Sequence, residues 1–107
     1  MDAIFTEENG KAVLGLTGEM TIYEAEKIRK CVMDSVFSDA DSVEINLSGV
    51  EEIDTCGIQV LMLAKRESER LDKELVLTSH SSSVLELMDV FNLADYFGDP
   101  IVLSTKN

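Results

Sequence analysis

The stretch Val50-Glu51-Glu52-Ile53-Asp54-Thr55-Cys56-Gly57-Ile58 decides the fold of this chain. It follows a strand-like run, Val43-Glu44-Ile45-Asn46-Leu47, and leads into the apolar run Val60-Leu61-Met62-Leu63-Ala64. A polar loop with a carboxylate, a hydroxyl and a thiol is therefore expected where a strand gives way to a helix. Ligands and modifications gather at such turns in α/β folds, because the first amides of a helix lack partners within it.

The rest of the chain is predicted from hydrophobic periodicity and turn signals. Strands are expected over residues 3–6, 11–17, 42–47 and 73–78, with Asn9-Gly10 as the tight turn of an opening hairpin. Residues 18–20 and 50–54 are expected to be loops, and Ser48-Gly49 to turn the chain. A short turn at 94–97 and a last edge strand at 101–103 complete the prediction.

Apolar residues spaced by three or four predict three helices. The first runs from Thr21 to about residue 37, with its inner face formed by Ile22, Ala25, Ile28, Val32 and Val36. The second runs from Thr55 or Cys56 to about residue 71, and the third from Ser83 to about residue 92. Glu24 and Glu86 follow Thr21 and Ser83 at capping-box spacing.

Strands separated by helices favour parallel neighbours, and the opening hairpin adds an antiparallel pair. We therefore expect an α/β fold, in which a mixed sheet of four to five strands carries three or four helices. A length of 107 residues predicts a single domain over 1–107.

Composition narrows the possible functions. The formal net charge of −12 argues against binding to nucleic-acid phosphates or to an anionic membrane surface. No apolar run can span a bilayer and no signal-peptide pattern opens the chain, so a cytoplasmic location is expected. The sequence has one His, no Cys-x-x-Cys and no phosphate-binding glycine loop, so neither a metal nor another cofactor is expected.

Three residues of the central loop could carry chemistry. The Thr55 hydroxyl could cap the following helix, which is the commoner role, or accept a phosphate beside the positive end of the helix. Asp54 could cap the same helix or hold the loop. Cys56 is a packed thiol rather than a nucleophile, because position 62 is Met where a cysteine phosphatase needs Arg, and His80 is the one available base. We therefore predict that the protein is not an enzyme.

The order of elements and this loop together resemble the STAS domain of bacterial anti-sigma factor antagonists. The resemblance covers nearly the whole chain and rests on four segments: Leu16-Thr17-Gly18-Glu19-Met20, Ile45-Asn46-Leu47-Ser48-Gly49-Val50, Ile53-Asp54-Thr55-Cys56-Gly57-Ile58, and residues 82–93. Asp-Ser/Thr-x-Gly after the central strand is the most specific of them. Thr55 replaces the commoner Ser, and Cys56 stands where another small residue is usual.

The resemblance implies a phosphorylation switch. The residue after the loop Asp, here Thr55, would be phosphorylated by a partner serine/threonine kinase that is also an anti-sigma factor, and phosphorylation would release the protein. Asp54 would shape the acceptor site and Gly57 would let the partner approach. The implied partner-binding residues are Glu19, Met20, Asp54, Thr55, Cys56, Gly57, Ile58 and Gln59.

Stand-alone STAS adaptors of chemotaxis or two-component pathways offer an alternative partner class. A STAS subunit of a lipid-transport ATPase, which uses a similar loop to hold its partner without phosphorylation, offers another. In an adaptor of either kind, Thr55 would serve as a helix cap only.

Overall fold

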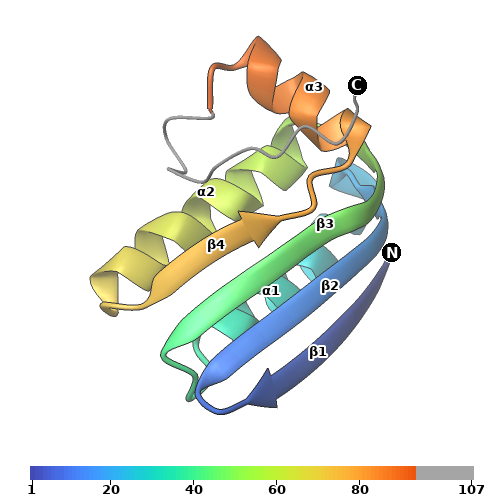
Figure 1. The fold of residues 1–107 in the computed structure, drawn as a ribbon. Coiled ribbons are helices and arrows are strands. Elements are labelled where there is room, and N and C mark those ends of the chain that lie inside the picture. Colours follow the sequence, from blue (N-terminus) through green and yellow to red (C-terminus); the bar gives the residue numbers. More distant parts are fainter. Residues whose placement is uncertain (94–107) are drawn as a thin grey trace.

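The computed structural model describes residues 1–93, in which four strands form one sheet in the order β1-β2-β3-β4. The strands are β1 (Asp2–Glu8), β2 (Lys11–Met20), β3 (Ser42–Ile53) and β4 (Glu74–Thr78). A short 3₁₀ turn, η1 (Ile22–Glu24), and the helices α1 (Ala25–Val36), α2 (Thr55–Arg70) and α3 (Ser82–Val90) complete this part of the chain (Figure 1). None of these helices is long and apolar enough to cross a membrane.

The predicted α/β class and mixed sheet are confirmed. Strand β1 pairs antiparallel with β2, and the other two pairs are parallel. The hairpin turns at Asn9 and Gly10, which have φ angles of 52° and 80°, as a tight two-residue turn requires. The turn expected at 94–97 and the strand expected at 101–103 lie outside the described residues.

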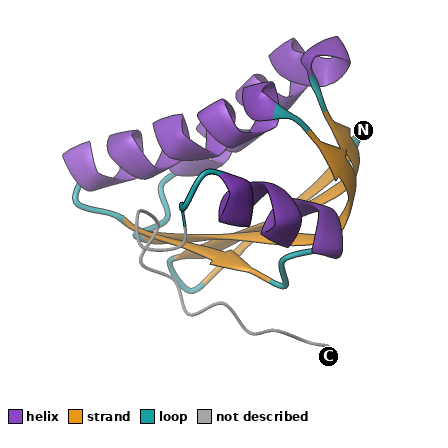
Figure 2. Cartoon of the chain, turned by 90° about the horizontal axis from the view of Figure 1, so that it is seen from above, coloured by secondary structure: helices purple, strands orange, loops and turns teal. Residues whose placement is uncertain are grey.

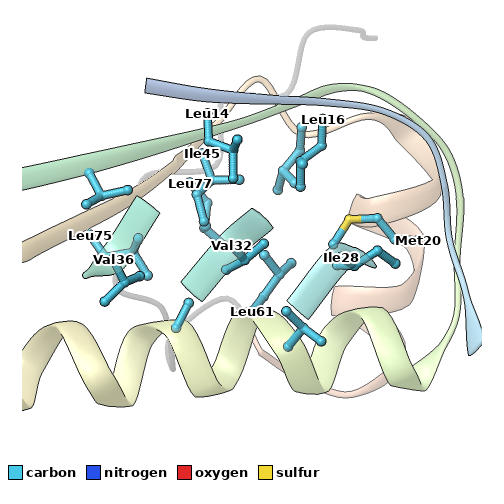
Figure 3. Packing of buried hydrophobic residues seen from close by; sticks show 14 of the residues in the cluster. Leu14, Leu16, Met20, Ile28, Val32, Val36, Ile45, Leu61, Leu75 and Leu77 are labelled. Atoms are coloured by element: carbon cyan, nitrogen blue, oxygen red, sulfur yellow. The ribbon is translucent and has the colours of Figure 1, made fainter. Parts of the chain in front are cut away.

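Helices α1 and α2 lie side by side on one face of the sheet (Figure 2). Leu14, Ile45 and Leu77 are neighbours across β2, β3 and β4, and all three are buried. Val32 of α1 and Leu61 of α2 belong to the same buried cluster (Figure 3). Each such side chain stabilises the fold by about 1.5–3 kcal/mol, so this layer fixes the two helices on the sheet.

The loops predicted at residues 18–20 and 50–54, and the turn at Ser48-Gly49, are wrong. Strand β2 continues through Met20 and strand β3 through Ile53, where these two residues pair, and of the predicted loops only Asp54 lies outside a strand. The register shifts between Gly15 and Thr17 and again between Gly18 and Glu19. Propensity considered one strand at a time predicts that these polar, glycine-containing segments form loops. The register shifts let the two strands remain paired through them.

Both predicted capping boxes are also wrong. The Thr21 side chain makes no capping hydrogen bond, and Glu24 accepts a hydrogen bond from the N-terminal amine of Met1 at 3.1 Å. Helix α3 is capped by Ser81, whose Oγ accepts from the Val84 amide at 3.3 Å. Ser83 instead donates its hydroxyl hydrogen to the Glu51 carbonyl at 2.7 Å and so ties α3 to β3.

Lys73, just before β4, closes the end of α1. Its Nζ donates to the carbonyl oxygens of Val36, at 2.7 Å, and of Ser38. The carbonyls at a helix C-terminus have no partners within the helix, and a cation there also interacts favourably with the helix dipole.

We expect Lys73→Met to lower the free energy of unfolding by about 1–3 kcal/mol, because the substitution leaves these carbonyls without their charged donor. Urea denaturation measures the change. Lys27→Met is the matched control, since Lys27 is exposed and forms no ion pair with the described residues. Equal stability of the two variants would contradict this role for Lys73.

Candidate functional site

The candidate site lies where the ends of β2 and β3 meet the start of α2 (Figure 1). The last pair of the two strands is Met20 with Ile53, and the amide of Asp54 donates to the Met20 carbonyl at 3.2 Å. Helix α2 begins at the next residue, Thr55. The strand pairing therefore sets where the helix starts and which way its first turn faces.

Asp54 connects two segments through one carboxylate. Its Oδ1 accepts hydrogen bonds from the amides of Cys56, at 2.9 Å, and Gly57, at 3.3 Å. Its Oδ2 accepts from the amide of Ile22, at 2.9 Å. Asp54 is thus the N-cap of α2 and also the anchor of the turn after β2, so both roles considered for it from the sequence are present.

Thr55 is not the cap, which corrects the commoner of the two roles considered for it. It is the first residue of α2, its side chain is exposed, and its hydroxyl forms no hydrogen bond with the described residues. The amides of Cys56 and Gly57 are already bonded to Asp54. A phosphate on Thr55 would therefore stand beside a carboxylate and would not take over those amides.

Gly57 is required by the packing of α2 against the sheet. A Cβ at this position would lie 2.5 Å from the Met20 carbonyl oxygen and 2.8 Å from Cγ1 of Ile53. Contacts below about 3 Å do not occur for real Cβ atoms, so any side chain would push α2 away from β2 and β3. Gly57 therefore allows the helix to approach the strands, which corrects the expectation that it lets a partner approach.

The other predicted contact residues divide between interior and surface. Met20 is fully buried and Ile58 is 4% exposed, so both belong to the hydrophobic core beneath the site. The expectation that they lie on its surface is therefore wrong. Cys56 is half-buried with a free thiol. Gln59 is exposed, one turn beyond Thr55, and Glu19 is exposed near the end of β2.

Two like charges stand next to each other at this edge. Glu19 pairs in register with Glu52 of β3, and both side chains are exposed. Neither forms an ion pair with the residues that the structure describes. Like charges opposite each other on neighbouring strands are destabilising, so this edge of the sheet has an uncompensated negative potential.

Sequence reasoning missed two exposed apolar residues at the site. Ile22 is 62% exposed and Tyr23 is 90% exposed, although Ile22 was assigned to the inner face of the first helix. The first turn is 3₁₀, not α, so its residues are rotated away from the face that continues into α1. The adjacent pair Ile22-Tyr23 gives no such signal in the sequence, because neighbouring helix residues such as Val60 and Leu61 of α2 are both buried.

We call Ile22, Tyr23, Thr55 and Gln59 together the Thr55 surface. The hydrogen bond between the Ile22 amide and Asp54 holds the first two residues beside the start of α2. Within residues 1–93 no group of three or more His, Cys, Asp or Glu side chains is placed to hold a metal ion. The Thr55 surface thus combines apolar area, a free hydroxyl and an amide, which are the groups of a protein-binding surface.

Residues 3–107 match the STAS domain family, and the chain belongs to that family. The intermembrane phospholipid transport system binding protein MlaB of Haemophilus influenzae is 30% identical over 96 residues, which cover 87% of this chain and 91% of that protein.

Solved structures share the fold. An anti-sigma factor antagonist from Mycobacterium paratuberculosis superimposes with a TM-score of 0.83 at 16% identity, over 95% of this chain and 86% of the other. The Bacillus cell fate determinant SpoIIAA in its phosphorylated form superimposes with a TM-score of 0.69 at 18% identity, over 94% and 92% of the two chains. The predicted resemblance to the anti-sigma factor antagonists is thereby confirmed for the fold.

We expect Gly57→Ala to lower the free energy of unfolding by about 1–3 kcal/mol, the usual cost of an added methyl group in a well-packed region. Thermal or urea unfolding measures the loss. Gly15→Ala is the matched control, because a Cβ there would meet its nearest atom at 3.9 Å and the backbone φ is ordinary. A Gly57→Ala variant as stable as the Gly15→Ala variant would show that the close approach of α2 is not a constraint.

Proposed function

We propose that this chain is a non-enzymatic adaptor that binds a protein partner through the Thr55 surface. The observation that carries the proposal is the position of Thr55, which is exposed at the first turn of α2 and forms no hydrogen bond with the described residues. Asp54 performs the capping, so stability of the helix does not account for the Thr55 hydroxyl. A partner that hydrogen-bonds this hydroxyl would use the helix end without disturbing its cap.

The sequence similarity favours a transport complex as the partner. MlaB, which is 30% identical over most of both chains, is named as a binding protein of a phospholipid transport system. The anti-sigma factor antagonists are similar in fold but share under a quarter of their residues with this chain. We therefore place the partner among the subunits of such a transport system, ahead of an anti-sigma factor, a kinase or a chemotaxis protein.

The test is affinity capture from the source organism, followed by titration with the purified partner that is identified. We expect Thr55→Arg to weaken binding at least about tenfold, because a bulky cation would replace a small hydroxyl at the centre of the contact. Thr6→Arg is the matched control, because Thr6 is also exposed but pairs with Val13, seven residues before the end of β2.

Binding that survives Thr55→Arg would contradict the proposal. The same holds if Thr6→Arg weakens binding as strongly, since the effect would then follow from added charge and not from position. Circular dichroism of both variants checks that the fold is retained.

A phosphorylation switch at Thr55 is a second candidate function. The exposed and unbonded hydroxyl favours it, because a kinase can reach the oxygen without unfolding the helix. A phosphate would add about −1.5 to −2 charges. This charge would lie next to Asp54, at an edge that is already negative, and a partner that covers Thr55 with apolar atoms would have to bury it.

Incubation with ATP and a cell extract should label the wild-type chain at Thr55, as mass spectrometry would show, and Thr55→Ala should abolish the label. Thr55→Asp should weaken partner binding at least about tenfold, whereas the uncharged, similarly sized Thr55→Asn should bind more tightly than Thr55→Asp. A label that persists in Thr55→Ala assigns the modification elsewhere. Equal binding by the Asp and Asn variants would mean that charge at this position has no effect on the partner.

A further inference from the structure

We propose that Ile22 and Tyr23 are the apolar anchor of the Thr55 surface, and that the partner offers an apolar pocket bordered by basic side chains. This inference rests on the proposed function and specifies what the partner must look like. Among the exposed large apolar residues of 1–93, Tyr23 is the most exposed at 90%, and Ile22 follows Ile4 and Val90 at 62%. These two side chains are adjacent in the chain and sit at the site.

The position of the anchor is fixed by the site itself. Ile22 donates its amide hydrogen to Oδ2 of Asp54, while Oδ1 of the same carboxylate holds the first turn of α2. The anchor and Thr55 are therefore connected through one side chain, and their surfaces are continuous. Any partner that covers the Thr55 hydroxyl also meets Ile22.

Tyrosine suits this role. Its ring brings a large apolar area with few rotatable bonds, and its hydroxyl can stay hydrated at the rim, which is why Tyr is enriched among the residues that dominate binding energy. The structure gives Tyr23 no compensating contact to hold it on its own chain, as its exposed fraction of 90% shows. Its apolar area is covered only when something else binds.

The charge of the partner follows from the surroundings of the anchor. Glu19 and Glu52 lie side by side at the ends of β2 and β3, without cations to compensate them among the described residues. On the other side of the anchor, a shallow hollow of η1 and α1 is lined by the acidic Glu24 and Glu26 and by the basic Lys27 and Lys30, so the charges there balance. The uncompensated negative charge at this end of the strands is therefore that of Glu19 and Glu52, in a chain whose net charge is −12.

A basic rim on the partner would relieve the repulsion between Glu19 and Glu52, and would speed the encounter. A second copy of this acidic chain would increase the repulsion, and so would an anionic membrane. The charge therefore favours a basic protein surface over either of these occupants.

The experiment uses photo-crosslinking and then titration. The photoreactive amino acid p-benzoylphenylalanine is placed at position 23 of the full chain in the source organism, and at position 37 in a control. Phe37 is a matched control because it is also an exposed aromatic residue, 53% accessible, but lies at the opposite end of α1. The cross-linked peptide is identified by mass spectrometry, and its parent protein is purified for titration.

We expect position 23 to cross-link to a peptide with apolar residues next to Lys or Arg, and position 37 not to cross-link to it. In the titration, Tyr23→Ala should weaken binding at least about tenfold, Tyr23→Phe should change it little, and Phe37→Ala should leave it unchanged. The double variant Glu19→Gln, Glu52→Gln should weaken binding and flatten its dependence on salt, because it removes the charges that face the basic rim.

Several outcomes would overturn the inference: a cross-link to a second copy of the chain or to lipid, an acidic cross-linked peptide, or full affinity of Tyr23→Ala. If Thr55→Arg abolishes binding while Tyr23→Ala does not, the anchor is wrong and the proposed function stands. If neither variant affects binding, the proposed function itself fails. Because Tyr23 is so exposed, the loss of its side chain does not endanger folding, and each outcome is interpretable.

Discussion

The site depends on one carboxylate that is shared between two segments. Asp54 bonds the first amides of α2 with one oxygen and the amide of Ile22 with the other. An N-cap of this kind stabilises a helix by about 1 kcal/mol, and hydrogen bonds to a charged acceptor are stronger than neutral ones. Its second function is geometric, since it fixes the turn after β2 against the start of α2. The exposed residues of two distant segments thereby form one rigid surface.

The second constraint is the distance between α2 and the sheet. The Cα of Gly57 lies so close to the Met20 carbonyl that no side chain fits. Met20 and Ile58 are buried under the same contact. The residues of the signature loop thus have two separate roles. Asp54 and Gly57 fix the position of α2 against the strands, and Thr55 between them is exposed for contact with a partner. A short motif in a sequence cannot show this division, because the two kinds of residue alternate in it.

Most of the architecture could be predicted from the sequence. Hydrophobic periodicity and the Asn9-Gly10 turn are local properties, and they gave the order of elements and the mixed sheet. The errors arose where a distant partner decides the outcome. Strands β2 and β3 continue through glycine-containing segments because they pair with each other, and Ser83 gives up a capping role to bond the Glu51 carbonyl. Of the predicted contact residues, Thr55, Gln59 and Glu19 are exposed, whereas Met20, Gly57 and Ile58 are inside, a difference that depends on tertiary packing.

The arrangement also constrains how a phosphate could act. In many proteins a phosphate at a helix N-terminus is stabilised by free amides and by the helix dipole. Here the amides of Cys56 and Gly57 are occupied by Asp54, and Glu19 and Glu52 add negative charge at the same edge. A phosphate on Thr55 would therefore gain little from its own chain and would remain directed at solvent or at a partner.

The same physical arrangement serves a permanent adaptor and a switched one. The two functions differ in the surface of the partner. A kinase uses the Thr55 hydroxyl as a nucleophile. The partner of an adaptor needs the same hydroxyl as a small polar contact beside the apolar Ile22 and Tyr23.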